Sequence, residues 1–145
     1  MKRLILNRYD LLNRKIREPT VRTRMLRTVG IWTLATVVGL FFVLAGFSKL
    51  AGPSGVNWAI RLSHWGYPAG TRYAIGGVEM LSAVGLLIPS FRRWAAVILA
   101  AMMLGAFASH LSHGEFPRLI PPLVLGGLLY ALFAWQSRAP EKASR

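Results

Sequence analysis

Residues 29–48 read VGIWTLATVVGLFFVLAGFS, a run of 20 residues without one charged side chain. A helix rises about 1.5 Å per residue, and the hydrocarbon core of a bilayer is roughly 30 Å thick. About 20 consecutive, mostly apolar residues are therefore enough to cross a membrane. The run predicts a transmembrane helix.

Three further apolar blocks follow in a chain of 145 residues that is 54% hydrophobic. Four such blocks leave too little polar surface to cover them, which argues against a soluble bundle of buried helices. We therefore expect an all-α membrane protein, a four-helix transmembrane bundle. Its spans are expected at about residues 29–51, 73–89, 94–112 and 119–136.

The basic residues indicate how the bundle is oriented. Of the 18 lysines and arginines, nine precede the first span, Arg92 and Arg93 fill the second connection, and three follow the fourth span. The first and third connections hold only three between them. This is the positive-inside pattern of a protein with both termini in the cytoplasm, and it argues against a nucleic-acid partner. The expected organisation is a basic cytoplasmic segment (1–28), a membrane domain (29–136) and a cytoplasmic tail (137–145).

The N-terminal segment allows three interpretations. Apolar residues recur at helical spacing from Ile5 to Ile16 between arginines, which suits a helix lying on an anionic inner leaflet. A frayed basic tail that only sets the topology is equally compatible, and an Arg-rich start also mildly resembles an organelle transit peptide. The apolar run that follows is too long for a cleavable signal peptide.

The connections predict how the helices are joined. Gly52 and Pro53 break the first helix, and the outer loop after them places Trp58, Leu62 and Trp65 on one helical face. We expect a short interfacial helix there, with its tryptophans as anchors. The other two connections are short, which favours antiparallel packing of consecutive helices.

Glu79 lies inside the second apolar block, six residues after Tyr73 and so roughly 9 Å deep at about 1.5 Å per residue. Burying an ionised group in a bilayer costs on the order of 3 kcal/mol or more, so such a residue is a candidate functional site. Glu79 is either part of a structural ion pair or hydrogen bond, or a proton carrier and ligand contact.

Two other ionisable residues are expected at similar depth. Lys49 ends the first span and His110 lies near the end of the third, so both fall with Glu79 in the outer half of the membrane. Small residues lie on the same helical faces, including Gly46 beside Lys49 and Gly76 beside Glu79, and such residues mark close helix contacts. The three side chains are therefore predicted to form one site, although Lys49 could instead extend to the interface.

His110 is open to three interpretations: a proton relay, a metal or haem ligand, or an interface histidine. His113 follows at the i+3 spacing, but no thiol and no clearly placed second acid supports a metal site, and none is assigned. The chain has no cysteine, which excludes thiolate chemistry within it, and no glycine-rich phosphate loop.

Several motifs together resemble the DoxX family of small bacterial membrane proteins. They are LFFVLAGFSKL at residues 40–50 with its Gly-x-x-Lys-Leu ending, Trp-Gly-Tyr-Pro at 65–68, Gly-Val-Glu at 77–79 leading to Gly-Leu-Leu-Ile at 85–88, and Met-Met at 102–103 ahead of His110. The resemblance covers residues 30 to 136. Lys49, Glu79 and His110 match recurring polar positions of the family.

The resemblance implies a multi-pass protein of the bacterial inner membrane. Some members are subunits of a thiosulfate:quinone oxidoreductase, and others accompany oxidative-stress or cofactor-maturation systems. We therefore expect an accessory or quinone-interacting subunit with a protein partner or a second copy. Glu79 would handle protons, His110 would bond a quinone carbonyl, Lys49 would stabilise negative charge, and Trp65 and Tyr67 would line the mouth of the site. The alternatives are a non-catalytic scaffold or assembly factor and, third, a small transporter or lipid-binding protein.

Overall fold

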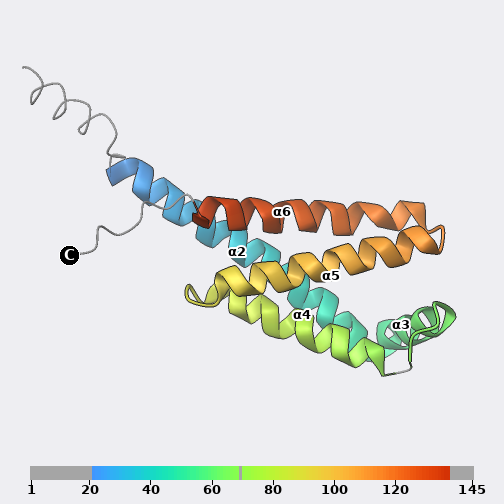
Figure 1. Ribbon diagram of the computed structural model, residues 1–145. Helices are drawn as coiled ribbons and strands as arrows, with labels where there is room; N and C mark the ends of the chain where they lie inside the picture. Colours follow the sequence, from blue (N-terminus) through green and yellow to red (C-terminus); the bar gives the residue numbers. More distant parts are fainter. Residues whose placement is uncertain (1–20, 69, 138–145) are drawn as a thin grey trace, which may run out of the picture. The chain divides into compact units, whose positions relative to one another are not determined.

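The computed structural model describes residues 21–68 and 70–137, which are helical apart from short connections (Figure 1). Residues 1–20 and the tail beyond residue 137 are not among the described residues. The three interpretations of the N-terminal segment and the prediction of a cytoplasmic tail therefore stay predictions. The chain divides into two compact units, residues 1–30 and residues 31–145, and every candidate site residue lies in the second. The elements are α2 (Val21–Leu50), α3 (Gly52–His64), α4 (Thr71–Leu87), α5 (Arg92–Ser112), the 3₁₀ turn η1 (Phe116–Leu119) and α6 (Ile120–Ser137).

Among the described residues, three stretches are long and apolar enough to cross a membrane: Val21–Leu50, Arg92–Ser112 and Phe116–Ser137. Helix α4 has 17 residues, which is the lower limit of the usual length of a span. Helix α2 has 30 residues and begins well before residue 29, where the apolar run begins. Its first turns are helical but charged, so hydropathy marks the apolar part of this helix and not its full length.

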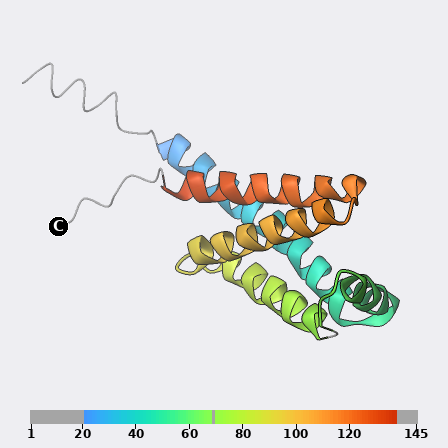
Figure 2. The same cartoon turned by 45° about the vertical axis from the view of Figure 1, so that its right-hand side comes forward.

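The helices of the second unit follow one another in antiparallel order. Figures 1 and 2 agree that α5 and α6 run side by side in opposite directions and that α4 lies against α5. The helix predicted after the first span is found as α3, which lies at the same end as the turn between α5 and α6 (Figure 2), and its place at the membrane interface stays a prediction. A shared apolar core runs between the four longer helices, with Phe42, Leu86, Leu99, Leu129 and Leu132 fully buried.

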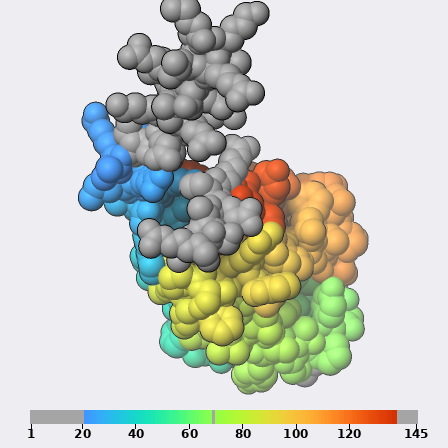
Figure 3. Space-filling model, turned by 60° about the vertical axis from the view of Figure 1, so that its left-hand side comes forward, coloured from blue at the N-terminus to red at the C-terminus, as the bar shows by residue number. Residues whose placement is uncertain are grey.

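The outward surface of these helices is apolar. Leu81, Leu104 and Tyr130 are each more than 70% exposed, and many other large apolar side chains are exposed with them. In Figure 3, α4 in green and the start of α5 in yellow lie together at the surface. An apolar surface of this extent suits contact with lipid and does not suit contact with water.

Helices α2 and α4 cross closely at two glycines. A Cβ atom added to Gly46 would lie 2.7 Å from the carbonyl oxygen of Gly76, and one added to Gly76 would lie 2.8 Å from the carbonyl oxygen of Gly46. Backbone atoms this close leave no room for any side chain. The predicted role of these small residues as contact points is confirmed, and the crossing holds Lys49 next to Glu79.

Gly46→Ala is expected to destabilise the protein by about 1–3 kcal/mol, because the new methyl group meets backbone that must move. Gly127→Ala is the matched control, since a Cβ atom there has no neighbour within 4 Å. Thermal unfolding in detergent, followed by circular dichroism, compares the two. Equal melting temperatures for both variants would contradict the close crossing.

Candidate functional site

A cavity of about 490 Å³ lies among the helices of the second unit. Every helix from α2 to α6 contributes to its wall. The lining is largely apolar, with Phe42, Trp58, Leu62, Trp65, Met102, Met103 and Leu125 among the larger side chains. The polar groups that reach it are few: Lys49, Tyr67, Thr71, Glu79, Ser109 and His110. All five residues predicted to form the site, from three helices and one loop, line this single cavity.

Lys49 and Glu79 form a buried ion pair. The ammonium Nζ of Lys49 donates to Oε2 of Glu79 at 2.7 Å, and the two side chains are only 8% and 4% exposed. The same ammonium donates to the carbonyl oxygen of Ala45 at 3.2 Å and lies 4.7 Å from the ring centroid of Trp58. Lys49 therefore does not extend away from the bundle: of the two predicted alternatives, the pair with Glu79 is the one found.

An arginine from α4 supplies a hydrogen bond to a carbonyl group at the C-terminus of helix α2. Arg72 donates through Nη1 to the carbonyl oxygen of Lys49 at 3.4 Å, where the helix can no longer supply a partner. Gly55 makes this approach possible, because a Cβ atom there would lie 2.6 Å from the same nitrogen. The start of α4 thus fixes the last turn of α2, on which Lys49 stands.

His110 pairs with a carboxylate other than Glu79. Its Nδ1 lies 2.8 Å from Oε2 of Glu115, and the histidine side chain is 9% exposed. The geometry follows from the way helix α5 ends. Gly114 has a φ of +70°, the amide of Gly114 donates to the carbonyl of Leu111, and the amide of Glu115 donates to the carbonyl of His110. These are the two bonds of a Schellman motif, and they bring the Glu115 side chain back to the imidazole.

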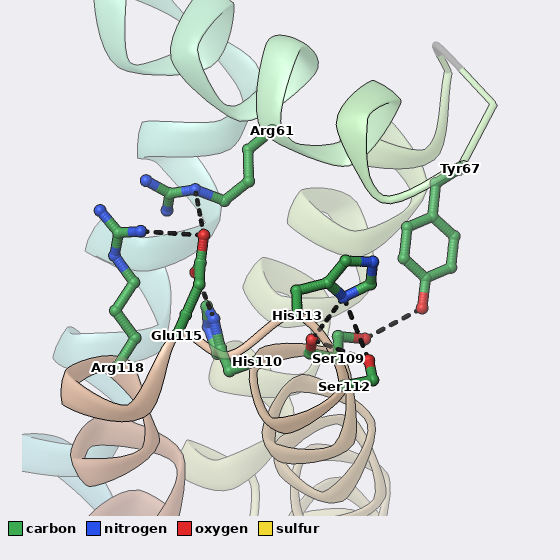
Figure 4. Close-up of polar contacts among 8 residues, drawn as sticks. All are labelled: Arg61, Tyr67, Ser109, His110, Ser112, His113, Glu115 and Arg118. Carbon is green, nitrogen blue, oxygen red and sulfur yellow. Dashed lines mark hydrogen bonds and ion pairs between the residues drawn. The ribbon is translucent and has the colours of Figure 1, made fainter.

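Two arginines hold Glu115 in place (Figure 4). Arg118 lies 3.1 Å and Arg61 lies 3.9 Å from its Oε1, so the carboxylate joins α3, the end of α5 and η1. Burial alone would raise the pKa of the Glu115 carboxyl. The hydrogen bonds from His110 and Arg118, with the charges of Arg118 and Arg61, outweigh that effect and hold the pKa below its ordinary value of 4.5.

Because this carboxyl has a lower pKa in the folded protein than in the unfolded chain, its contribution to stability is complete above about pH 4.5 and is lost as the pH falls through the folded pKa. The difference in melting temperature between the protein and Glu115→Gln should therefore be constant at neutral pH and shrink below about pH 4.5. Thermal scans of both proteins from pH 3 to pH 8 measure it. A difference that grows as the pH falls would contradict the pairing.

Trp65 and Tyr67 reach the cavity from the end of α3. A second Schellman motif, with Gly66 at a φ of +82°, joins the amide of Tyr67 to the carbonyl of Leu62. The hydroxyl of Tyr67 then lies 2.9 Å from the hydroxyl of Ser109, which ties this loop to α5 (Figure 4). The ring of Trp65 meets His110 edge-on, with 5.0 Å between centroids.

His110 in α5 and His113 directly after α5 do not converge on a common point. Nδ1 of His113 lies 2.7 Å from the carbonyl oxygen of Ser109, whereas Nδ1 of His110 lies beside Glu115. His113 stacks on Trp65, with 5.2 Å between ring centroids. Within the part of the chain that the structure describes, no three His, Asp or Glu side chains come together as a metal site.

Sequence reasoning missed Glu115, Arg61 and Arg118. A local signal for Glu115 was present, since a glycine after the last turn of a helix predicts that the next residue folds back on it. No local sequence pattern pairs Arg61 with Glu115, because the two lie 54 positions apart in the chain. The predicted cluster is therefore one cavity with two separate pairs: the ion pair Lys49–Glu79 and the hydrogen-bonded pair His110–Glu115.

Comparison with known proteins agrees with the motifs. A family profile described as the DoxX-like family matches residues 33–132, which is more than half of the chain. The match contains most of α2 and all of α3, α4 and α5, and with them the whole cavity. No curated protein and no solved structure matches the chain.

Proposed function

This chain belongs to the DoxX-like family, and on that premise we propose that it is a quinone-interacting subunit of a membrane redox system. The chain is an integral, multi-pass membrane protein. We place α2, α4, α5 and α6 across the bacterial inner membrane, with both termini in the cytoplasm. The cavity then opens toward the outer leaflet, near α3. The distribution of basic residues supports this orientation.

The observation that carries the proposal is the make-up of the cavity. Binding sites for small molecules are typically apolar spaces of about 300–1,000 Å³ with a few convergent polar groups. The cavity has about 490 Å³, an apolar lining, and the polar residues Glu79, His110 and Ser109 on its wall. A quinone ring is flat and apolar and carries two oxygens on opposite edges, so it suits a space with polar groups on facing helices.

Each residue has a role in this proposal. Conversion between quinone and quinol moves two electrons and two protons. The electrons would be exchanged with a redox partner protein, because this chain has no cysteine and no dinucleotide motif. Glu79 and His110 would contact the ring oxygens and exchange their protons, Lys49 would keep Glu79 in place, and Trp65 and Tyr67 would form the wall at the mouth.

Quinone binding can be measured through the tryptophans. Trp58 and Trp65 line the cavity, so a short-chain benzoquinone bound there should quench their fluorescence to saturation. Glu79→Gln should weaken binding of the corresponding hydroquinone about tenfold or more, since it replaces a charged acceptor for a ligand hydroxyl by a neutral one. Ser137→Ala, at the far end of α6, is the control and should bind normally.

Two outcomes would contradict the proposal. Quenching that rises linearly and never saturates would show that quinone only dissolves in the detergent. If the ligand binds Glu79→Gln as tightly as it binds the original protein, Glu79 does not contact the ligand. If partner proteins are recovered normally while no quinone binds, the scaffold interpretation replaces the one proposed.

A further inference from the structure

We infer that the cavity selects the reduced, hydroxyl-bearing form of its ligand, a hydroquinone, and that Glu115 is the positioning residue that creates this preference. The inference rests on the proposed function and adds to it the oxidation state that binds. It follows from the hydrogen-bonding character of two groups that face the cavity, the side chains of Glu79 and His110, which their partners in the structure fix.

The first fixed group is the Glu79 carboxylate. Its Oε2 accepts a hydrogen bond from the ammonium of Lys49 at 2.7 Å. Its Oε1 has no partner among the residues that the structure describes, and Glu79 lines the cavity. A carboxylate held in an ion pair only accepts hydrogen bonds. This side of the cavity therefore offers an acceptor to a ligand.

The second fixed group is the imidazole of His110. Its Nδ1 lies 2.8 Å from Glu115, and a carboxylate accepts only, so the ring proton is on Nδ1. In the neutral ring this leaves a lone pair on Nε2. Nε2 has no partner within residues 21–68 and 70–137, and His110 also lines the cavity. Nε2 of His110 therefore also offers a hydrogen-bond acceptor to a ligand in the cavity.

The other polar groups on the cavity wall do not change its preference for a ligand that donates hydrogen bonds. The Lys49 ammonium already donates to Glu79 and to the carbonyl of Ala45, and it lies over the ring of Trp58. The hydroxyls of Tyr67, Thr71 and Ser109 rotate and can serve as donor or acceptor. The groups of fixed character are both acceptors, so the best ligand brings two donors.

A hydroquinone has two O–H groups, whereas the corresponding quinone has two carbonyl oxygens that only accept. A quinone in this cavity would place its lone pairs against those of Glu79 and His110. Leaving buried acceptors without a donor weakens binding by roughly tenfold to a hundredfold. The preference depends on Glu115, because without a carboxylate at Nδ1 the ring proton is free to move to Nε2 and turn that nitrogen into a donor.

Arg61 and Arg118 keep Glu115 in its carboxylate form, which it needs in order to hold the ring proton of His110 on Nδ1. Arg61 and Arg118 both contact its Oε1 and leave Oε2 to His110. The pKa of Glu115 is below its ordinary value for the reasons given above. The carboxylate therefore stays charged at neutral pH and keeps His110 in one tautomer.

The test compares three ligands on the full-length protein in detergent, without oxygen, at about pH 8, where free imidazole is neutral. They are a short-chain benzoquinone, its hydroquinone, and the hydroquinone dimethyl ether, which has a similar shape but no O–H group. Titration calorimetry should show the hydroquinone binding at least tenfold more tightly than either of the other two. A quinone that binds as tightly as the hydroquinone overturns this inference but leaves the proposed function intact. If none of the three binds, the proposed function itself fails.

Glu115→Gln tests the positioning role, with Arg118→Gln as its matched control. The first removes the carboxylate at Nδ1, and the second removes a contact to Oε1 that does not involve His110. The preference for hydroquinone should fall toward parity in Glu115→Gln, be restored in Glu115→Asp and persist in Arg118→Gln. The nitrogen-15 spectrum of the unmodified protein should show His110 protonated at Nδ1. A proton at Nε2, or an unchanged preference in Glu115→Gln, would overturn the role of Glu115.

Discussion

Replacing Glu79 alone by leucine is expected to lower the free energy of unfolding by about 3–5 kcal/mol. The cause is the partner left behind: the ammonium of Lys49 stays buried with no opposite charge near it. Lys49→Met should cost a similar amount, because it leaves the carboxylate of Glu79 unpaired. Denaturation in mixed micelles with increasing SDS, followed by tryptophan fluorescence, measures both losses.

The double variant Lys49→Met with Glu79→Leu is the matched control. Apolar residues that replace both members of a buried ion pair are often neutral or stabilising, so this protein should unfold within about 1 kcal/mol of the original. If the single variants lose no stability, the pair is not buried as described. If the double variant is as unstable as the single ones, the helices need the charges themselves to pack.

Ala106→Phe is expected to abolish ligand binding while the protein stays folded. Ala106 lies on α5 and lines the cavity, so a phenyl ring there occupies the space that the ligand needs. Binding of a short-chain quinone or hydroquinone should fall by about a hundredfold or more, which corresponds to about 2.7 kcal/mol or more of lost interaction. Fluorescence quenching and calorimetry both measure it.

The control for this variant lies two residues away. Ala108 is exposed on the same helix and is not part of the cavity wall. Ala108→Phe adds the same ring to the outer surface and should bind the ligand normally. Binding that survives in Ala106→Phe would show that the ligand occupies another place on the protein.

Much of the fold could be predicted because apolar runs carry strong information about helices in membranes. The run at residues 29–48 predicted α2, although its charged first turns extend to Val21. Gly52, predicted to break the first helix, has a positive φ and begins α3. The four-span topology stays a prediction, because α4 has only 17 residues and is not among the three stretches long and apolar enough to span, within the described residues.

The candidate site could be predicted in part. Glu79 was found from the cost of burying a charge, and Lys49 from its depth and the small residues on its face. The pair of His110 with Glu115 was not foreseen, because no depth or periodicity argument reaches the loop after α5. The contact of Arg61 with Glu115 depends on how α3 folds against the end of α5, which is a tertiary arrangement with no local signal.

The Lys49–Glu79 pair is proposed to belong to a ligand site and not to serve the structure alone. The most direct test is the affinity of the double variant Lys49→Met with Glu79→Leu for a short-chain hydroquinone, measured by titration calorimetry on protein shown to be folded. The predicted result is near-original stability with binding weakened at least tenfold. A folded double variant that binds the hydroquinone as tightly as the original protein would contradict the claim.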